Sequence, residues 1–180
     1  MMRLQELYKK KILPEMKSKF GYKNDLEAPK INKVVVNAGI GKFAKDKAYI
    51  DNVVSSLSRI TGQKPVLTKS KKSISGFKVR EGSIVGVMVT LRGKRMYDFL
   101  EKLVNAAFPR IRDFRGLDAK GVDNKGNLSV GFREHLAFPE IKADEVDKIH
   151  GMEVCISTTA KTKEEGLELF KLMGFPFKKA

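Results

Sequence analysis

The residues best suited to chemistry lie in one basic run at positions 68–82. Between Lys69 and Arg80 this run has five cations and no carboxylate. Cations neutralise phosphates, serine hydroxyls bond to phosphate oxygens, and glycine lets the backbone follow an irregular shape. The run therefore favours a loop that contacts RNA; the alternative is a solvated hairpin loop whose lysines only keep the protein soluble. The residues assigned to this contact are Lys69, Ser70, Lys71, Lys72, Ser73, Ser75, Gly76, Phe77, Lys78 and Arg80.

A glycine pattern between a predicted strand and a predicted helix is the clearest enzyme-like signal. Gly39, Gly41 and Ala44 match the loose fingerprint of a dinucleotide-binding loop. Such a site also needs an acidic residue about 20 positions later, where this chain has Pro-Val-Leu-Thr-Lys over 65–69. A phosphate loop is excluded because Phe43 stands where a metal-binding Ser or Thr is required. The pattern indicates a plain glycine turn, or a helix start whose free N–H groups meet an RNA phosphate.

No catalytic or metal-binding set can be assembled from local spacing. His135 and His150 are the two histidines, and neither has a nucleophile near it in the sequence. Cys155 is the single cysteine, which excludes an internal disulfide and a thiolate zinc site. We expect no enzymatic activity, no cofactor and no metal.

The charge of the chain is large and unevenly distributed. The net charge is +15, which favours a polyanionic partner: nucleic acid first, an anionic membrane second. Residues 1–133 hold 29 Lys or Arg against 12 Asp or Glu, whereas residues 134–180 hold 7 against 9. The polyanion should therefore meet the first part of the chain, and the acidic segment faces another partner or only water. With no apolar run of about 18 residues and no secretory signal, we expect a cytoplasmic protein.

Two predicted strands turn small polar groups away from their buried faces. The strand over 30–38 does so with Asn37, and the strand over 84–92 with Thr90. Neither strand contains an aromatic residue, so bases have no platform on which to stack. Binding should instead depend on the shape and backbone of structured RNA.

The remaining pattern predicts helices around these strands. Residues 3–20 form a helix that Pro14 breaks or kinks into two pieces, within a basic arm over 1–23 that lies on the surface or against RNA phosphates. The other expected elements are a helix capped by Asp46 and ended by Gly62, two short strands around the basic loop, a helix over 94–108 stopped by Pro109, a loop over 110–128, a strand over 152–159 and a last helix with a Thr162–Glu165 capping box.

These elements predict an α+β fold: a mostly antiparallel sheet with helices packed on one face and an extended basic loop. We expect a single domain over 1–180 that is monomeric when free.

Several segments resemble one known family in order along nearly the whole chain. They are INKVVVNAGIG at 31–41, TGQKP at 61–65, KSKKSISGFKVREG at 69–82, VGVMVTLRGKRMYDFL at 85–100, FPRIRDFRGL at 108–117 and HLAFPEI at 135–141. The chain resembles the bacterial form of the large-subunit ribosomal protein L-five family, whose members bind 5S rRNA.

The resemblance implies a place in the central protuberance of the ribosome and contacts to 5S rRNA, large-subunit rRNA and P-site tRNA, the last through the basic loop. It also implies an intersubunit bridge to the small-subunit head protein S-thirteen. The 5S rRNA contacts implied are Asn37, Gln63 and Thr90, with Lys33 and Arg92 beside them. The bridge residues implied are Arg110, Arg112, Asp113, Phe114, Arg115, Gly116, Glu145 and Asp147.

Two other classes of function compete with a structural RNA-binding protein. An RNA-modifying enzyme or an RNA chaperone also binds RNA, and detectable turnover would identify the enzyme. A peripheral membrane protein needs a basic amphipathic helix with exposed large apolar residues. Residues 3–20 come nearest to that, but the positive charge continues well beyond them, so we expect no membrane binding.

Overall fold

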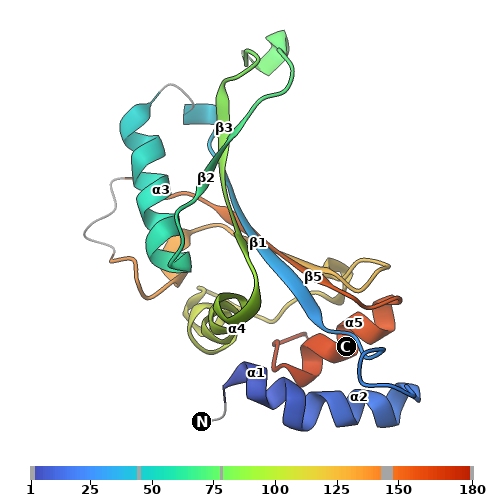
Figure 1. The fold of residues 1–180 in the computed structure, drawn as a ribbon. Helices are drawn as coiled ribbons and strands as arrows, with labels where there is room; N and C mark the ends of the chain where they lie inside the picture. Colours follow the sequence, from blue (N-terminus) through green and yellow to red (C-terminus); the bar gives the residue numbers. More distant parts are fainter. Residues whose placement is uncertain (1–2, 44–45, 78, 143–147, 179–180) are drawn as a thin grey trace. The chain divides into compact units, whose positions relative to one another are not determined.

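A computed structural model describes residues 3–43, 46–77, 79–142 and 148–178. Five strands form an antiparallel sheet in the order β2-β3-β1-β5-β4 (Figure 1). The strands are β1 Ile31–Gly39, β2 Val66–Lys69, β3 Ile84–Leu91, β4 Leu128–Phe132 and β5 Met152–Thr158. The α-helices are α1 Leu4–Leu7, α2 Leu13–Phe20, α3 Lys47–Thr61, α4 Gly93–Lys102 and α5 Lys163–Leu172. This sheet with its helices confirms the predicted α+β fold.

Local sequence signals set the ends of the helices as predicted. The Asp46 side chain accepts a hydrogen bond from the Tyr49 N–H at 3.1 Å and caps α3. Gly62 ends that helix with a left-handed φ of 66°. Thr162 and Glu165 form the reciprocal capping box at the start of α5.

Pro14 was predicted to break or kink the helix, and of these two effects the break does not occur. Helical residues continue from Leu4 to Phe20, with a π-helical turn over Tyr8–Ile12 between α1 and α2. Proline lacks an N–H and its ring crowds the preceding turn, and the wider π turn directly before Pro14 accommodates both effects. A second π turn, Leu103–Ala107, follows α4 and leads into a 3₁₀ turn that contains Pro109.

Two strand predictions also need correction. β4 begins at Leu128, the last residue of the loop predicted over 110–128, and runs through a stretch where we predict no strand. It is five residues long and contains Gly131, which weakens the strand signal, although its burial alternates along its length. Around the basic loop, β2 is one expected short strand, whereas the other is reduced to an isolated Ile74–Val79 bridge.

Contacts divide the chain into two compact units. One unit consists of Met1–Val34, Leu91–Val130 and Cys155–Ala180, and the other of Val35–Thr90 and Gly131–Val154. We call them the terminal unit and the central unit. The predicted single domain with an arm over 1–23 stays a prediction.

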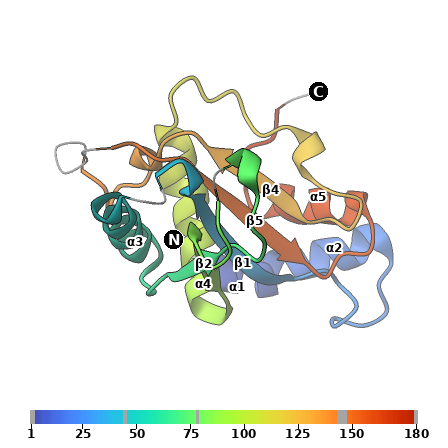
Figure 2. The same ribbon diagram turned by 90° about the horizontal axis from the view of Figure 1, so that it is seen from above.

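The terminal unit packs the N-terminal helices beside α5 (Figures 1 and 2). Leu4, Tyr8, Ile12 and Met16 form a buried stripe along α1, the π turn and α2. The Lys19 ammonium lies 2.7 Å from the Glu168 carboxylate of α5. The first helical segment of the chain is thus held partly by the last helix.

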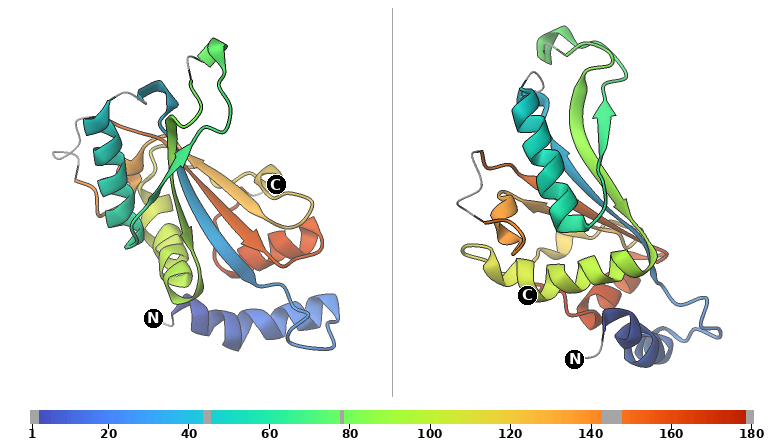
Figure 3. Two further views of the ribbon diagram at one scale, coloured as in Figure 1. Left: turned by 45° about the horizontal axis from the view of Figure 1, so that its top comes forward. Right: turned by 60° about the vertical axis from the view of Figure 1, so that its left-hand side comes forward.

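In the central unit α3 covers one face of the strands (Figure 3). Its side chains Val53 and Leu57 are fully buried, as are Val36 on β1 and Val87 on β3. Because side chains alternate along a strand, the residues between these buried positions belong to the opposite face. In the described residues no helix of the central unit lies on that face, which we call the open face.

Candidate nucleic-acid interface

Three predicted RNA-contact residues belong to the central unit. Asn37 lies on β1, Thr90 near the end of β3, and Gln63 in the turn between α3 and β2. The Gln63 amide Nε2 donates a hydrogen bond to the Thr90 carbonyl oxygen at 3.2 Å. All three side chains are half-buried. The alternation predicted from sequence is observed, because Val36 and Ala38 on either side of Asn37 are fully buried.

Asn37 and Thr90 keep their side-chain hydrogen-bonding capacity. Within the part of the chain that the structure describes, neither the Asn37 amide nor the Thr90 hydroxyl bonds to another protein group. A half-buried polar group without a partner is costly unless water or a ligand satisfies it. The open sheet face therefore presents neutral donors and acceptors and not charges.

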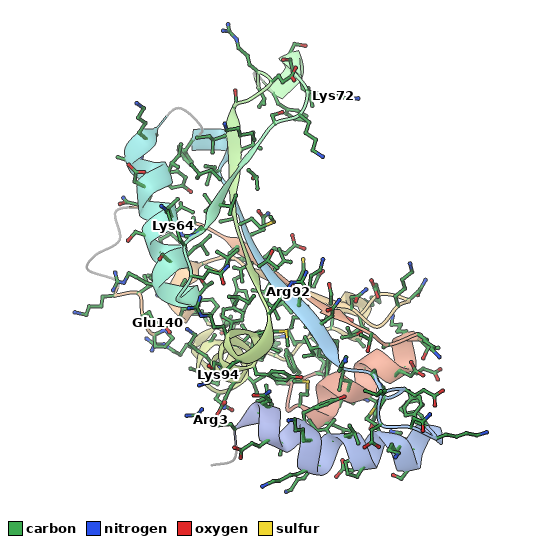
Figure 4. All side chains as sticks on the ribbon, in the orientation of Figure 1. Arg3, Lys64, Lys72, Arg92, Lys94 and Glu140 are labelled. Atoms are coloured by element: carbon green, nitrogen blue, oxygen red, sulfur yellow. The ribbon has the colours of Figure 1, made fainter. Side chains whose placement is uncertain are left out.

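Lys33 and Arg92, the two predicted cationic neighbours, belong to the terminal unit. Lys33 is half-buried on β1, and Arg92 is exposed directly before α4. Figure 4 labels Arg92 together with Lys94, which is also exposed in the first turn of α4. Two cations beside the positive end of a helix dipole repel it, and a bound anion would relieve that repulsion.

The basic loop forms the tip of the β2–β3 hairpin (Figure 3). Its base is closed by hydrogen bonds from the Ser70 N–H to the Ser83 carbonyl at 2.8 Å and from the Gly82 N–H to the Ser70 carbonyl at 3.0 Å. A 3₁₀ turn, Ser75–Phe77, lies at the tip, and Lys72 points outward in Figure 4. The described cations of the loop are exposed: Lys69, Lys71, Lys72 and Arg80.

Not every hydroxyl of this loop is free for phosphate. The Ser70 hydroxyl donates to the Lys72 carbonyl at 2.7 Å, and the Ser73 hydroxyl accepts from the Glu81 N–H at 2.9 Å. These two serines shape the loop, whereas Ser75 and Gly76 lie exposed at the tip. Phe77 is 78% exposed, so it offers an uncovered aromatic face. Lys78 lies outside the described residues.

The loop over 110–116 lies in the terminal unit and is firmly anchored. Phe114 stacks on the buried Phe108, with ring centroids 5.4 Å apart. A Cβ on Gly116 would lie 2.8 Å from the backbone nitrogen of Lys178, so the C-terminal segment passes directly over it. Asp113 has a left-handed φ of 53°. The exposed charged residues of this loop are Arg110, Arg112, Asp113 and Arg115.

The acidic part of the predicted bridge cannot be compared with the fold, because Glu145 and Asp147 lie outside the described residues. On either side of them the chain is tied to α3 within the central unit. The Arg59 guanidinium donates to the Glu140 carbonyl at 2.6 Å, and the Lys148 ammonium lies 2.8 Å from the Asp46 carboxylate.

The two histidines, separate in sequence, form a buried pair. Their rings stack with centroids 3.9 Å apart, and His135 Nδ1 accepts a hydrogen bond from the His150 N–H at 3.3 Å. Burial lowers the pKa of both, and that of His150 falls to about 4. This pair was missed from sequence because its members are fifteen positions apart, too far for local spacing to place their rings together. Among the described residues no three His, Cys, Asp or Glu side chains gather where a metal could bind.

Two family models match the chain. One, described as "Ribosomal protein L5", matches residues 24–80, and the other, which describes the C-terminus of the same ribosomal family, matches residues 84–177. The chain is also 54% identical over 177 residues to the "Large ribosomal subunit protein uL5" of Carboxydothermus hydrogenoformans, covering 98% of this chain and 99% of that protein. The chain belongs to the ribosomal protein L5 family.

Other family members are similar over their full length. The uL5 proteins of Halothermothrix orenii and Syntrophomonas wolfei are each 53% identical to the chain. The matches cover 97% of both sequences in the first case, and 99% of this chain and all of its relative in the second.

Members of the L5 family are structural ribosomal proteins, so the expectation of a non-enzyme is confirmed. Ribosomal membership also agrees with the expected location on cytoplasmic ribosomes. In the described residues no helix is long and apolar enough to span a membrane.

Proposed function

We propose that the chain is a structural protein of the large ribosomal subunit and that it binds 5S rRNA through the open polar face of its central unit. Its relatives carry the name of a large-subunit protein. The observation that carries the 5S rRNA proposal is the pair of half-buried side chains, Asn37 and Thr90, whose amide and hydroxyl have no partner in the described residues. Neutral groups of this kind suit ribose hydroxyls and base edges. Lys33 and Arg92, which belong to the terminal unit, are proposed to neutralise phosphates of the same RNA.

In this proposal other surfaces of the chain meet other parts of the ribosome. The protein helps attach 5S rRNA to large-subunit rRNA in the central protuberance. The exposed hairpin tip contacts P-site tRNA, and its uncovered Phe77 and exposed lysines support a role in binding an RNA surface. The anchored loop over 110–116, together with Glu145 and Asp147, contacts the small-subunit head protein S-thirteen. The free protein is monomeric.

The 5S rRNA site is tested by removing its hydrogen-bonding groups. Asn37→Ala and Thr90→Val should each weaken binding of a 5S rRNA transcript about fivefold, because one neutral hydrogen bond contributes about 1 kcal/mol. Gln63→Ala should also weaken binding, since the Gln63 side chain lies against Thr90. Filter binding measures the affinity, and thermal melting checks that the fold is intact.

Matched controls make the same chemical changes elsewhere. Asn52→Ala removes an exposed amide from α3, and Thr159→Val removes a hydroxyl that accepts from the Lys30 N–H at 3.0 Å. Both should bind 5S rRNA like the unchanged protein. Unchanged 5S rRNA affinity in the Asn37, Gln63 and Thr90 triple variant would remove the proposed site.

A further inference from the structure

The threonine hydroxyls fall into two groups: those that form a hydrogen bond within the protein and those that do not. The chain has six threonines, all of them in described parts of the chain. Four hydrogen-bond through the hydroxyl to other protein groups: Thr61, Thr158, Thr159 and Thr162. Within the described residues Thr68 and Thr90 do not. The two hydroxyls without a protein partner therefore belong to Thr90, already assigned to the 5S rRNA site, and to Thr68, which has no assigned role.

Thr68 lies on the same sheet face as Thr90. In the antiparallel pairing of β2 with β3, Thr68 is opposite Gly86. Directly opposed residues share a face, and residues at even spacing along β3, from Gly86 to Thr90, share it as well. The neighbouring position Leu67 pairs with the fully buried Val87 and so belongs to the face that α3 covers.

Gly86 lets the Thr68 hydroxyl approach Asn37. β3 lies between β2 and β1 in the sheet, so Gly86 separates Thr68 from Asn37. A Cβ placed on Gly86 would lie 2.7 Å from Thr68 Oγ1 and 3.5 Å from Asn37 Oδ1. The two oxygens thus lie on opposite sides of Gly86, where the backbone has no side chain to separate them. A side chain at position 86 would displace the Thr68 hydroxyl, whereas a Cβ would only touch the Asn37 amide.

We propose that Thr68 is a further RNA-binding residue, and that its hydroxyl and the Asn37 amide together bind a ribose 2′-hydroxyl of 5S rRNA across Gly86. This inference rests on the proposed function and adds one residue and one ligand group to it. Threonine both donates and accepts, and asparagine offers both kinds of group, which matches a 2′-hydroxyl that also donates and accepts. Neither side chain has the positive charge that phosphate recognition favours.

The first test changes only the hydroxyl. Thr68→Val keeps the branched shape that suits a strand and should weaken binding of a 5S rRNA transcript about fivefold, whereas Thr68→Ser should bind within about twofold of the unchanged protein. Both should melt like the unchanged protein. If Thr68→Val binds 5S rRNA normally while Asn37→Ala is weakened, this inference fails and the proposed function stands. If neither variant is weakened, the proposed site itself fails.

A second test identifies the RNA group that the Thr68 hydroxyl binds. A pool of 5S rRNA transcripts with scattered 2′-deoxy nucleotides is bound to the protein, and the bound fraction is sequenced for positions where the missing hydroxyl interferes. The unchanged protein should exclude at least one 2′-deoxy position that Thr68→Val no longer excludes. Identical interference patterns for the two proteins would overturn the ribose assignment.

A third variant leaves the hydroxyl in the protein but displaces it. The methyl group of Gly86→Ala would lie 2.7 Å from Thr68 Oγ1, so the hydroxyl must move. We expect 5S rRNA affinity to fall about as much as in Thr68→Val, and the Gly86→Ala, Thr68→Val double variant to lose little more than either one. Full affinity in Gly86→Ala would contradict the proposed geometry.

Discussion

The stacked pair His135 and His150 is stable only while both rings are uncharged. His150 is 5% exposed, and its Nε2 has no hydrogen-bond partner in the described residues. Burial and the neighbouring His135 lower the pKa of His150 to about 4. Burial also lowers the pKa of His135, although the Glu134 carboxylate opposes that shift. Protonation of either ring therefore favours the unfolded chain, where imidazole is solvated.

This argument predicts a loss of stability in mild acid. The unfolded chain takes up the proton near the ordinary histidine pKa of 6.5, whereas folded His150 resists it until about pH 4. The free energy of unfolding should therefore fall as the pH drops below 6.5, by about 2 kcal/mol between pH 7 and 5 for His150 alone.

Urea unfolding of the unchanged protein and of His150→Phe at both pH values measures this. Phe keeps a flat ring in the stack and cannot be protonated, so the variant should lose less stability across that range. An equal pH dependence in the two proteins would show that His150 does not carry the effect.

At the scale of elements, the features that could be predicted were helix ends and strand faces, because these depend on residues close together in the sequence. Asp46 and Gly62 mark the ends of α3 because caps are made within a few residues of the helix. The faces of β1 follow from simple alternation, which is why Asn37 could be assigned. Thr68 could not, because its role depends on the register of β2 against β3. The π turn before Pro14 was missed because tertiary packing of α1 and α2 decides whether a helix continues past proline.

A backbone contact between α5 and the turn at Gly126, which lies far away in the sequence, gives a prediction about stability. A Cβ on Gly166 would clash with Gly126 Cα, so the two glycines let backbone meet backbone. Gly166→Ala should lower the stability by about 1–3 kcal/mol, because neither backbone can yield easily. Gly131→Ala is the matched control, since a Cβ there meets nothing within 4 Å. Equal melting temperatures for the two variants would contradict the close contact.

For the tip of the β2–β3 hairpin we predict that deletion leaves the binding of 5S rRNA intact. Its base is closed by backbone hydrogen bonds between Ser70 and Ser83 and between Gly82 and Ser70, below the exposed tip. Deleting Lys71–Phe77 should leave 5S rRNA affinity within about twofold while impairing translation by reconstituted ribosomes. A large fall in 5S rRNA affinity on deletion would assign the tip to anchoring and not to tRNA contact.

At the scale of the whole molecule, the charge is the dominant property. Residues 1–133 carry a balance of +17, from 29 basic against 12 acidic residues, and residues 134–180 a balance of −2, from 7 against 9. A polyanion bound by the basic part releases counterions, so RNA affinity falls with salt. The acidic part should contribute almost nothing to that dependence if it faces a protein.

The salt dependence of 5S rRNA binding separates these two parts. The logarithm of the affinity should fall with the logarithm of salt concentration by about 0.7–0.9 for each phosphate neutralised. Reversing Arg92 and Lys94 should reduce the slope, whereas Glu145→Lys with Asp147→Lys should leave it almost unchanged and impair the joining of ribosomal subunits. A slope change in the acidic double variant as large as that in the basic one would disprove a separate protein-facing surface.

The way each unit is assembled from separate chain segments has a consequence for synthesis. The terminal unit needs Cys155–Ala180, and the central unit needs Gly131–Val154, so both wait for late residues. The N-terminal helices leave the exit tunnel well before α5, which supplies the Glu168 partner of Lys19. A nascent chain therefore exposes its basic, apolar N-terminal segment for most of the time that elongation takes. Chains released before α5 should be substrates for chaperones and proteases, while completed chains should escape both.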